Sequence, residues 1–339
     1  MGDVAVRDRQ PQPPSGLVRR ARDAFLHRRE ASVLIVAIGL VVYFQAATPI
    51  FLTPDNLRNI AQATAPTAIV AVGIVFLLVS GEIDISVGMV AALAPYLMHY
   101  AIDFYGVPAI PAIVLALAIS AVIGLANGLI TTRLRVPSFV TTLGMFYLIY
   151  GILLTTSRAY PVAIPEPVKG NLQSWLGGAD WASLIWCLAI VGVFHIVLTR
   201  TRWGLHTISV GGNLNGATEV GIRVNRIKVG NFMLVSVLGA LAGLMEAFRI
   251  NSIDPNIGGG TRITFTAIAA AVIGGTALAG GSGTVAGALI GMFVLAVLQN
   301  GFNLIGVDAN TYFLIQGAAI LLSMIANQYL ARLRRTGGS

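Results

Sequence analysis

Two carboxylates stand close together in one of the most apolar parts of the chain. Glu82 and Asp84 flank Ile83, and long apolar runs lie on both sides. An acid in hydrocarbon is costly, so by default it marks a proton relay, a polar point on a solute's path or a paired structural site. The two acids could instead cap a helix that begins near Ile85, because carboxylates are favoured at helix N-termini. The residue pattern leaves these interpretations open.

Other side chains suited to chemistry are few. The single cysteine, Cys187, lies in an apolar run, which predicts a buried structural thiol. The spacing of Glu246 and Arg249 predicts an ion pair one helical turn apart. The chain has no Walker A pattern, no Cys/His metal spacing and no nucleophile elbow. We therefore expect no catalytic site, no metal site and no bound cofactor, so energy for any active process must come from an ion gradient or another subunit.

The composition predicts that lipid surrounds these residues. The chain is 56% hydrophobic and 11% charged, and a soluble domain of this length could not cover its surface with polar groups. A helix needs roughly 20 apolar residues to cross the hydrocarbon core, and such stretches recur about ten times. We expect an all-α polytopic membrane protein with about ten transmembrane helices. The predicted spans are 32–48, 57–80, 84–102, 108–132, 138–156, 181–199, 229–250, 263–280, 283–305 and 311–331.

The basic residues predict the orientation of this domain. Ten spans place the tails 1–31 and 332–339 on one side, with a ten-helix domain, 32–331, between them. If the tails are cytoplasmic, 17 of the 22 Lys and Arg residues fall in interior segments, in line with the positive-inside rule. Because these residues lie at helix ends, topology explains the net charge of +8 better than nucleic-acid binding does.

Glycine runs predict interrupted helices and close helix packing. Residues 81–88, 274–275 and 280–283 separate apolar runs almost without a polar linker. Broken or re-entrant segments of this kind are tolerated at membrane depth where protein buries them or where they line a wet cavity. Glycines at four-residue spacing let two helix backbones approach closely, in the same chain or between chains. The candidate packing residues are Gly283, Gly287 and Gly291.

The loop 200–228 is predicted to be interior, polar and basic. Asn213 is a good helix N-cap and Gly221 a good C-terminal stop, which predicts a helix of about two turns between them. A short helix between basic flanks could dock into a groove of a soluble partner. The alternative is an amphipathic loop on the membrane surface.

A set of motifs in this order resembles the permease subunit of ATP-binding-cassette importers for simple sugars, the ribose and xylose type. They extend from about residue 35 to residue 330, and each is weak alone, whereas the ordered set is specific. The matching segments are GEIDISVG at 81–88, GLANGLI at 124–130, VPSFVTTLG at 136–144, VGGN at 210–213 with Gly221-Ile222, AIAAAVIGGT at 267–276, GGSGT at 280–284 and NGFNLIGV at 300–307.

The resemblance implies partners as well as a fold. It implies a homodimeric or pseudo-symmetric pair of ten-helix permeases in the inner membrane of a bacterial cell. It also implies cytoplasmic ATPase subunits and a periplasmic or lipid-anchored solute-binding protein that carries most of the selectivity. Residues 213–221 match the coupling helix that contacts the ATPase. The coupling candidates are Asn213, Ala217, Glu219 and Gly221.

The same motifs supply candidates for the pathway or the helix breaks. These are polar or aromatic residues within otherwise apolar segments. They are Glu82, Asp84, Ser86, Asn127, Phe139, Thr142 and Asn300.

The chain departs from the family pattern in two places. Residues 263–266 read Ile-Thr-Phe-Thr where the family often has a Tyr-Glu-Leu-Asp-like run, so both acids are absent. Residues 214–215 and 218–219 lack the acid and the arginine that family coupling segments often carry. These changes leave the architecture as expected, leave the cargo open and allow an unusual ATPase partner.

We therefore interpret the chain as the membrane-spanning subunit of an ATP-driven importer for a monosaccharide or a related small polar solute. Within this class, the alternatives are permeases for nucleosides or branched-chain amino acids. Outside it, the alternative is an ion-coupled secondary transporter in which Glu82 or Asp84 carries the coupling ion. Broken helices argue against a purely structural membrane scaffold.

Overall fold

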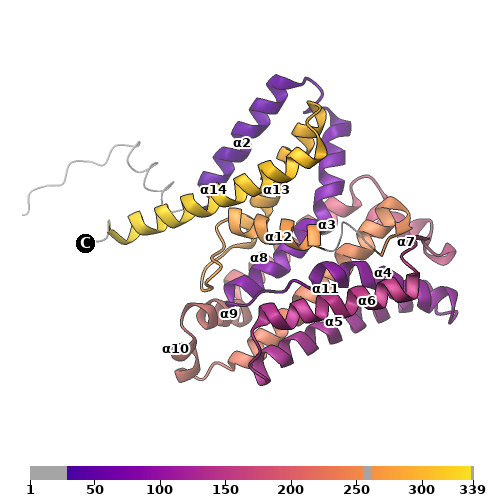
Figure 1. The fold of residues 1–339 in the computed structure, drawn as a ribbon, viewed down its shortest axis with the longest axis horizontal. Coiled ribbons are helices and arrows are strands. Elements are labelled where there is room, and N and C mark those ends of the chain that lie inside the picture. The colour runs from indigo at the N-terminus through magenta and orange to yellow at the C-terminus, as the bar shows by residue number, and fades with distance from the viewer. Residues whose placement is uncertain (1–28, 256–260, 337–339) are drawn as a thin grey trace, which may run out of the picture.

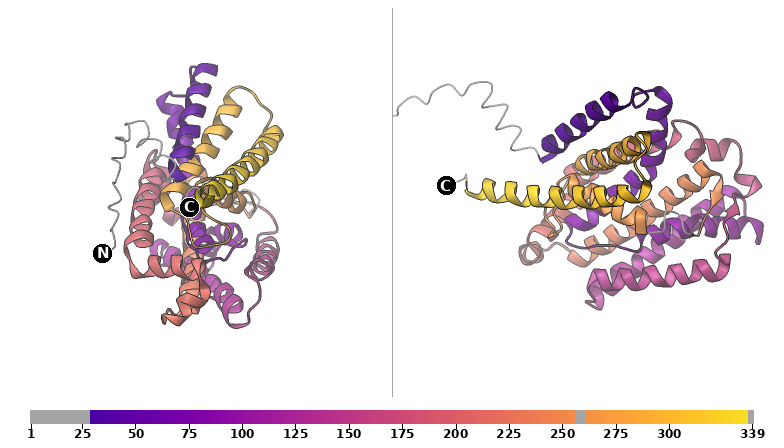
Figure 2. Two further views of the ribbon diagram at one scale, coloured as in Figure 1. Left: turned by 90° about the vertical axis from the view of Figure 1, so that its left-hand side faces the viewer. Right: turned by 45° about the horizontal axis from the view of Figure 1, so that its top comes forward.

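A computed structural model describes residues 29–255 and 261–336, and this part of the chain is mostly helical (Figures 1 and 2). The predicted N-terminal tail lies outside the described residues up to residue 28, and so do residues 337–339 of the C-terminal tail. Where the tails are described, they continue helices. Among the described residues, the helix nearest the N-terminus begins at Arg29 and the helix nearest the C-terminus ends at Thr336. The predicted domain boundaries at 32 and 331 fall within these two helices.

Each of the ten predicted spans contains one helix, as their apolar runs require, because a helix satisfies all its backbone groups within one segment. These helices are α2 (Arg29–Ala47), α3 (Pro54–Val79), α4 (Val87–Asp103), α5 (Ala109–Arg133), α6 (Ser138–Ser157), α8 (Ala182–Arg200), α11 (Val224–Ile250), α12 (Thr261–Ile273), α13 (Val285–Leu304) and α14 (Ala309–Thr336).

Within the described residues, six of these helices are long and apolar enough to cross a bilayer alone: α3, α5, α6, α8, α11 and α13. Two predicted spans are shorter than expected. Helix α4 has 17 residues and begins at Val87 rather than at Asp84, and α12 has 13 residues and ends at Ile273 rather than at residue 280. The extended segment 80–86 delays the start of α4, and the turn at Gly274 and Gly275 ends α12 early.

The two interruptions meet in space. The backbone N–H of Gly281 donates to the carbonyl of Val79 at 2.8 Å, although the two residues belong to different halves of the chain. A Cβ on Gly211, near the end of a further helix, would overlap the same Val79 carbonyl. Three segments that the sequence places on the interior side therefore converge at one backbone junction, made by residues 79–81, 211–212 and 280–281.

The helices form two groups around α3 and α11 (Figure 1). Helices α4 and α5 pack on α11, and α6 packs on α4 and α5. Helices α2 and α12 pack on α13, and α14 lies beside α12. Helix α3 packs against α11, α12 and α13 and is buried along most of its length, so it joins the groups.

The outer surface carries large apolar side chains. In the most apolar 18-residue stretch of each helix, the buried share is only 28% in α5, 28% in α6 and 22% in α8, against 78% in α3. Their exposed residues include Val122, Leu148 and Ile196. A surface of this kind requires a hydrocarbon environment, which agrees with a multi-pass membrane protein.

The small-residue face of α13 packs within the same chain. A Cβ on Gly287 or Gly291 would overlap a carbonyl of α12 or of the turn after it, at Gly274 and Ala270. A Cβ on Gly283 would lie 2.7 Å from the side chain of Thr276. The predicted close packing is therefore present, and the partner is the α12 region of this chain.

Irregular elements cover the end of the molecule opposite the glycine junction. Strand β1 (Val162–Ala163) pairs antiparallel with β2 (Ser252–Ile253), which ties together two loops far apart in the sequence. The hydroxyl of Tyr96 donates to the carbonyl of Tyr160 at 2.8 Å and pins the same loop to α4. Between β1 and α8 lie η1 (Glu166–Val168), α7 (Asn171–Gln173) and η2 (Ser174–Gly178).

Candidate functional site

The extended segment between α3 and α4 holds both of the carboxylates singled out by the sequence. Glu82 forms an ion pair with Lys228, the fifth residue of α11, at 2.5 Å. Both side chains are mostly buried, at 11% and 16% exposure. A pair with little solvent access is screened weakly, so this one ties the break to the start of α11. This partner could not be inferred from the sequence, because 146 residues separate the two.

Asp84 is fully buried and organises the turn into α4. Its Oδ1 accepts from the backbone N–H of Ser86 at 2.7 Å and from the Ser86 hydroxyl at 2.6 Å. Asn127 of α5 donates through Nδ2 to Ser86 Oγ at 3.0 Å and approaches Asp84 Oδ2 at 3.5 Å. Ser86 is the N-cap of α4, so the carboxylate acts on the helix start through its neighbour. The sequence therefore identified three residues that form one network.

Hydroxyl groups from distant helices satisfy the backbone of the same segment. Ser138 Oγ accepts from the N–H of Ile83 at 3.3 Å, and Thr142 Oγ1 accepts from the N–H of Ile85 at 3.2 Å. Thr264 of α12 accepts from Gly88 N–H at 3.0 Å and donates to the Ile85 carbonyl at 3.3 Å. Non-helical backbone persists in a membrane domain only where such partners exist. Thr142 thus belongs to the break, as predicted.

Two candidates from the sequence lie elsewhere. Phe139 is on α6, but its side chain is 52% exposed on the outside of the bundle, so the structure does not bring it to the break or to a cavity. Asn300 of α13 exchanges two amide hydrogen bonds with Asn56 of α3, at 2.9 and 2.8 Å. It lies at the other end of α3 from Glu82, so one predicted set of residues divides between two places.

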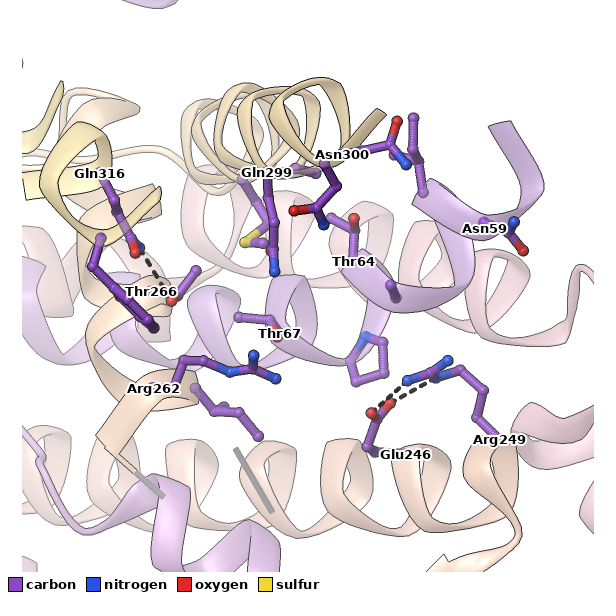
Figure 3. A pocket seen from close by; sticks show the side chains of 18 residues that line it. Asn59, Thr64, Thr67, Glu246, Arg249, Arg262, Thr266, Gln299, Asn300 and Gln316 are labelled. Carbon is purple, nitrogen blue, oxygen red and sulfur yellow. Dashed lines mark hydrogen bonds and ion pairs between the residues drawn. The ribbon is translucent and has the colours of Figure 1, made fainter. Parts of the chain in front are cut away.

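Asn300 borders a pocket of about 420 Å³ between α3, α11, α12, α13 and α14 (Figure 3). Polar side chains from all five helices line it. Glu246 and Arg249 of α11 form the predicted ion pair, with two contacts at 2.6 and 2.8 Å. Gln316 of α14 donates to Thr266 of α12 at 3.3 Å. The polar lining residues are Asn59, Thr64, Thr67, Glu246, Arg249, Arg262, Thr266, Gln299, Asn300, Asn303 and Gln316.

Sequence reasoning missed most of this lining, although a signal was present. Asn56, Asn59, Ala63 and Thr67 recur every three or four residues, so they mark one small or polar face on an otherwise apolar helix. Gln299, Asn300 and Asn303 do the same near the end of α13. An amide or hydroxyl stripe on a buried membrane helix needs polar partners. Such stripes were the available indication of a polar cavity.

The loop 200–228 contains two helices, where the sequence predicted one. Helix α9 (Arg202–Gly212) was missed, and α10 (Leu214–Glu219) is the predicted short helix. Asn213 caps α10 by accepting from the N–H of Gly216 at 2.9 Å, and Gly221 ends it at a φ of +81°. Both predicted boundaries are correct. In Figure 1, α10 lies at the edge of the molecule.

The two faces of α10 differ. Ala217 is 4% exposed and packs with Val210 and Ile227 inside the molecule. Leu214 and Val220 are 47% and 76% exposed, and Glu219 is exposed beside them. Ala217, one of the coupling candidates, therefore faces α9 and α11 rather than the exposed side of α10. The apolar surface available to a partner consists of Leu214 and Val220.

Helix α9 is anchored to the centre of the bundle. The indole N–H of Trp203 donates to Asn231 Oδ1 of α11 at 2.9 Å, and Asn231 Nδ2 donates to the carbonyl of Phe76 in α3 at 3.3 Å. The exposed α10 is thus connected through α9 to both central helices. Among residues 29–255 and 261–336, no group of three His, Cys, Asp or Glu side chains is placed to hold a metal ion.

Comparison with known proteins gives a consistent set of matches. Residues 56–324 match the family model described as branched-chain amino acid transport system / permease component. A xylose/arabinose import permease protein of Sulfolobus acidocaldarius is 35% identical, over 91% of this chain and 87% of its own. A ribose import permease protein of Escherichia coli is 34% identical, over 88% and 93%. An L-arabinose ABC transporter permease protein of Azospirillum brasilense is 31% identical, over 90% and 89%. No solved structure matches.

Proposed function

Because this chain belongs to the family of branched-chain amino acid transport system permease components, we propose that it forms the membrane-spanning subunit of an ATP-driven sugar importer. The observation that carries this proposal is similarity along nearly the whole of both chains to importers named for ribose, xylose and arabinose. These names favour a monosaccharide over a nucleoside or a branched-chain amino acid. The polar pocket agrees, because amide and hydroxyl side chains are suited to binding sugar hydroxyls.

In this proposal the pocket is part of the solute's path, and the segment 80–86 is a structural break that shapes one end of it. The ion-coupled alternative needs an acid free to exchange an ion during the cycle. Glu82 is paired with Lys228, and the carboxylate of Asp84 is occupied by Ser86 and Asn127. These contacts support capping and fixing of the broken helix rather than ion coupling.

The proposed complex contains ATPase subunits on the cytoplasmic side, a periplasmic or lipid-anchored solute-binding protein on the other side, and a second copy of the permease. Ten membrane passages with both termini in the cytoplasm would place α10 on the ATPase side. An apolar surface on a short exposed helix suits a groove in a soluble partner.

The direct test is reconstitution of the permease with its ATPase and solute-binding protein in liposomes. We expect uptake of a labelled monosaccharide that depends on ATP and persists when the proton gradient is dissipated. Uptake that collapses with the proton gradient at constant ATP would favour the secondary transporter instead.

Coupling through α10 has a test of its own. Val220→Asp places a charge on the exposed apolar face, and we expect it to weaken ATPase binding and ATP-dependent uptake by about tenfold or more, since a buried unpaired charge is costly at an interface. Leu134→Asp is the matched control, because Leu134 is also an exposed apolar loop residue, at 71% against 76% for Val220. Equal uptake in both variants would remove α10 from the proposed interface.

A further inference from the structure

The charges of the pocket do not balance. Its lining contains three ionisable side chains, Glu246, Arg249 and Arg262, and the other lining residues are neutral. Glu246 and Arg249 neutralise each other, since the guanidinium meets the carboxylate through Nε at 2.8 Å and through Nη2 at 2.6 Å. This two-contact geometry is the strong form of the Arg–carboxylate pair. One positive charge is therefore left over.

That charge belongs to Arg262, in the first turn of α12. Figure 3 shows its guanidinium pointing into the pocket, across from the Glu246–Arg249 pair. In the part of the chain that the structure describes, no carboxylate pairs with Arg262. Arg262 lines the pocket and is an exposed residue, so a solute that enters can reach it.

Neutral hydrogen-bonding groups surround this arginine. Thr67 of α3, Thr266 of α12 and Gln299 of α13 lie around the same space, as Figure 3 shows. Hydroxyl and amide groups both donate and accept, so they can bind sugar hydroxyls. A guanidinium presents a planar fork of N–H donors that matches a carboxylate. The pocket thus combines a polyol-binding lining with one anion-binding group.

We propose that the transported solute is a sugar acid, a polyhydroxylated molecule with one carboxylate that pairs with Arg262. This inference rests on the proposed function and specifies its substrate class. One uncompensated positive charge matches a carboxylate better than a phosphate ester, which carries about −1.5 to −2 at neutral pH. A low-dielectric pocket inside a membrane strengthens such a pair relative to the same pair in water.

The test compares acidic and neutral sugars in the reconstituted importer. The probes are labelled D-glucuronate and D-xylose, and the measured quantities are the maximal rate and the KM of ATP-dependent uptake. We expect glucuronate to be transported. We also expect Arg262→Gln to lower the maximal rate of glucuronate uptake by about tenfold or more, since hydrogen bonds to charged groups are stronger than those between neutral groups. Glucuronate uptake by the Arg262→Lys variant should lie between that of the wild type and that of Arg262→Gln. The positive charge remains in this variant, but the planar fork of donors is lost.

The control is Arg58→Gln. Arg58 pairs with Asp55 and Asp180 outside the pocket, and exposed pairs contribute little, so uptake should not change. Size-exclusion profiles and basal ATPase stimulation report whether each variant is folded and assembled.

Three results would overturn the sugar-acid proposal: transport of xylose without glucuronate, glucuronate uptake that Arg262→Gln leaves unchanged, or an equal loss of both sugars in Arg262→Gln. The last would assign Arg262 to folding or to docking of the binding protein. Each of these leaves the importer function intact. By contrast, the absence of ATP-dependent uptake for every sugar would contradict the proposed function itself.

Discussion

At the scale of single residues, the buried carboxylate of Asp84 is a strict test of how the break between α3 and α4 is held. Asp84→Asn keeps an acceptor oxygen for the Ser86 N–H and hydroxyl. The new amide would face the Nδ2 of Asn127, whose own Oδ1 has no hydrogen-bond partner among the described residues and can turn to accept. We expect Asp84→Asn to retain a substantial share of ATP-dependent uptake.

Asp84→Leu should behave differently. It removes every acceptor and leaves the Ser86 N–H buried without a partner, which costs about 1–3 kcal/mol for each such group. We expect loss of uptake and a lower melting temperature in detergent. If the Asn variant is as inactive as the Leu variant while remaining stable, the carboxylate must titrate during transport, and the capping interpretation would be wrong.

Residue types in the sequence identified the break but not its partners. Glu82, Asp84, Ser86 and Asn127 were recognisable because polar groups are costly in apolar runs. The ion pair to Lys228 and the hydroxyl of Thr264 were not recognisable, because both come from segments more than 140 residues away. Long-range partners depend on how helices pack, which a local pattern does not contain.

At the scale of elements, the glycine junction between α9, the end of α3 and the turn before α13 has a sharp internal control. A Cβ on Gly211 would overlap the Val79 carbonyl, whereas a Cβ on Gly212 would lie 3.7 Å from Gly281 Cα, an ordinary contact. We expect Gly211→Ala to destabilise the permease by roughly 1–3 kcal/mol, the usual range for overpacking. The Gly212→Ala variant should have the same melting temperature as the wild type.

The measurement is thermal unfolding of the purified permease in detergent, followed by uptake in liposomes. Because α9 carries α10, a displaced α9 should also lower the fraction of ATP hydrolysis that is coupled to uptake. Equal melting temperatures for the two alanine variants would show that the junction accommodates an added Cβ at Gly211 without loss of stability.

Elements were predictable to different degrees. Long apolar runs located a helix in each of the ten predicted spans, since a membrane helix is defined by its own composition, and six of these helices are long and apolar enough to cross a bilayer alone. The early end of α12 was missed because residues 274–280 remain apolar, and only the turn at Gly275, with a φ of +90°, reveals the stop. Helix α9 was missed because it lies in a segment interpreted from its caps and charges rather than from its periodicity.

At the scale of the whole molecule, orientation is a prediction that labelling can check. Cys187 is the only cysteine and is buried, so Cys187→Ser gives a background for single reporters. Lys169→Cys lies in the loop between α6 and α8, and Glu219→Cys lies in α10. We expect a membrane-impermeant maleimide to label the first in intact cells and the second only after the membrane is opened.

Labelling in the reverse order would invert the topology, and labelling of both positions from outside would require an even number of passages between them. A cysteine at Arg135, in the loop between α5 and α6, is a useful third reporter. Like Glu219→Cys, it should be labelled only after the membrane is opened, because both loops are predicted to be interior.

The pocket illustrates what only the assembled molecule contains. Five helices between residues 54 and 336 contribute to it, and no single segment has more than a stripe of polar residues. The sequence indicated that a polar solute crosses this membrane domain, through its broken helices and its resemblance to a family. It did not indicate where, because Glu246, Arg262 and Gln299 become neighbours only when α11, α12 and α13 pack together.

The hydrogen bonds from distant hydroxyl groups to residues 82–88 also determine when the break can be completed during synthesis. Thr264, which bonds both Ile85 and Gly88, is synthesised 179 residues after Ile85. At ribosomal rates of about 5–20 residues per second, that delay is roughly 9 to 36 seconds. During this interval the N-terminal helices are already made, but the unwound backbone has no Thr264 hydroxyl to bond. Water, lipid headgroups or the insertion machinery must satisfy those groups meanwhile, so the first half of the chain must wait in the membrane for the second to complete it.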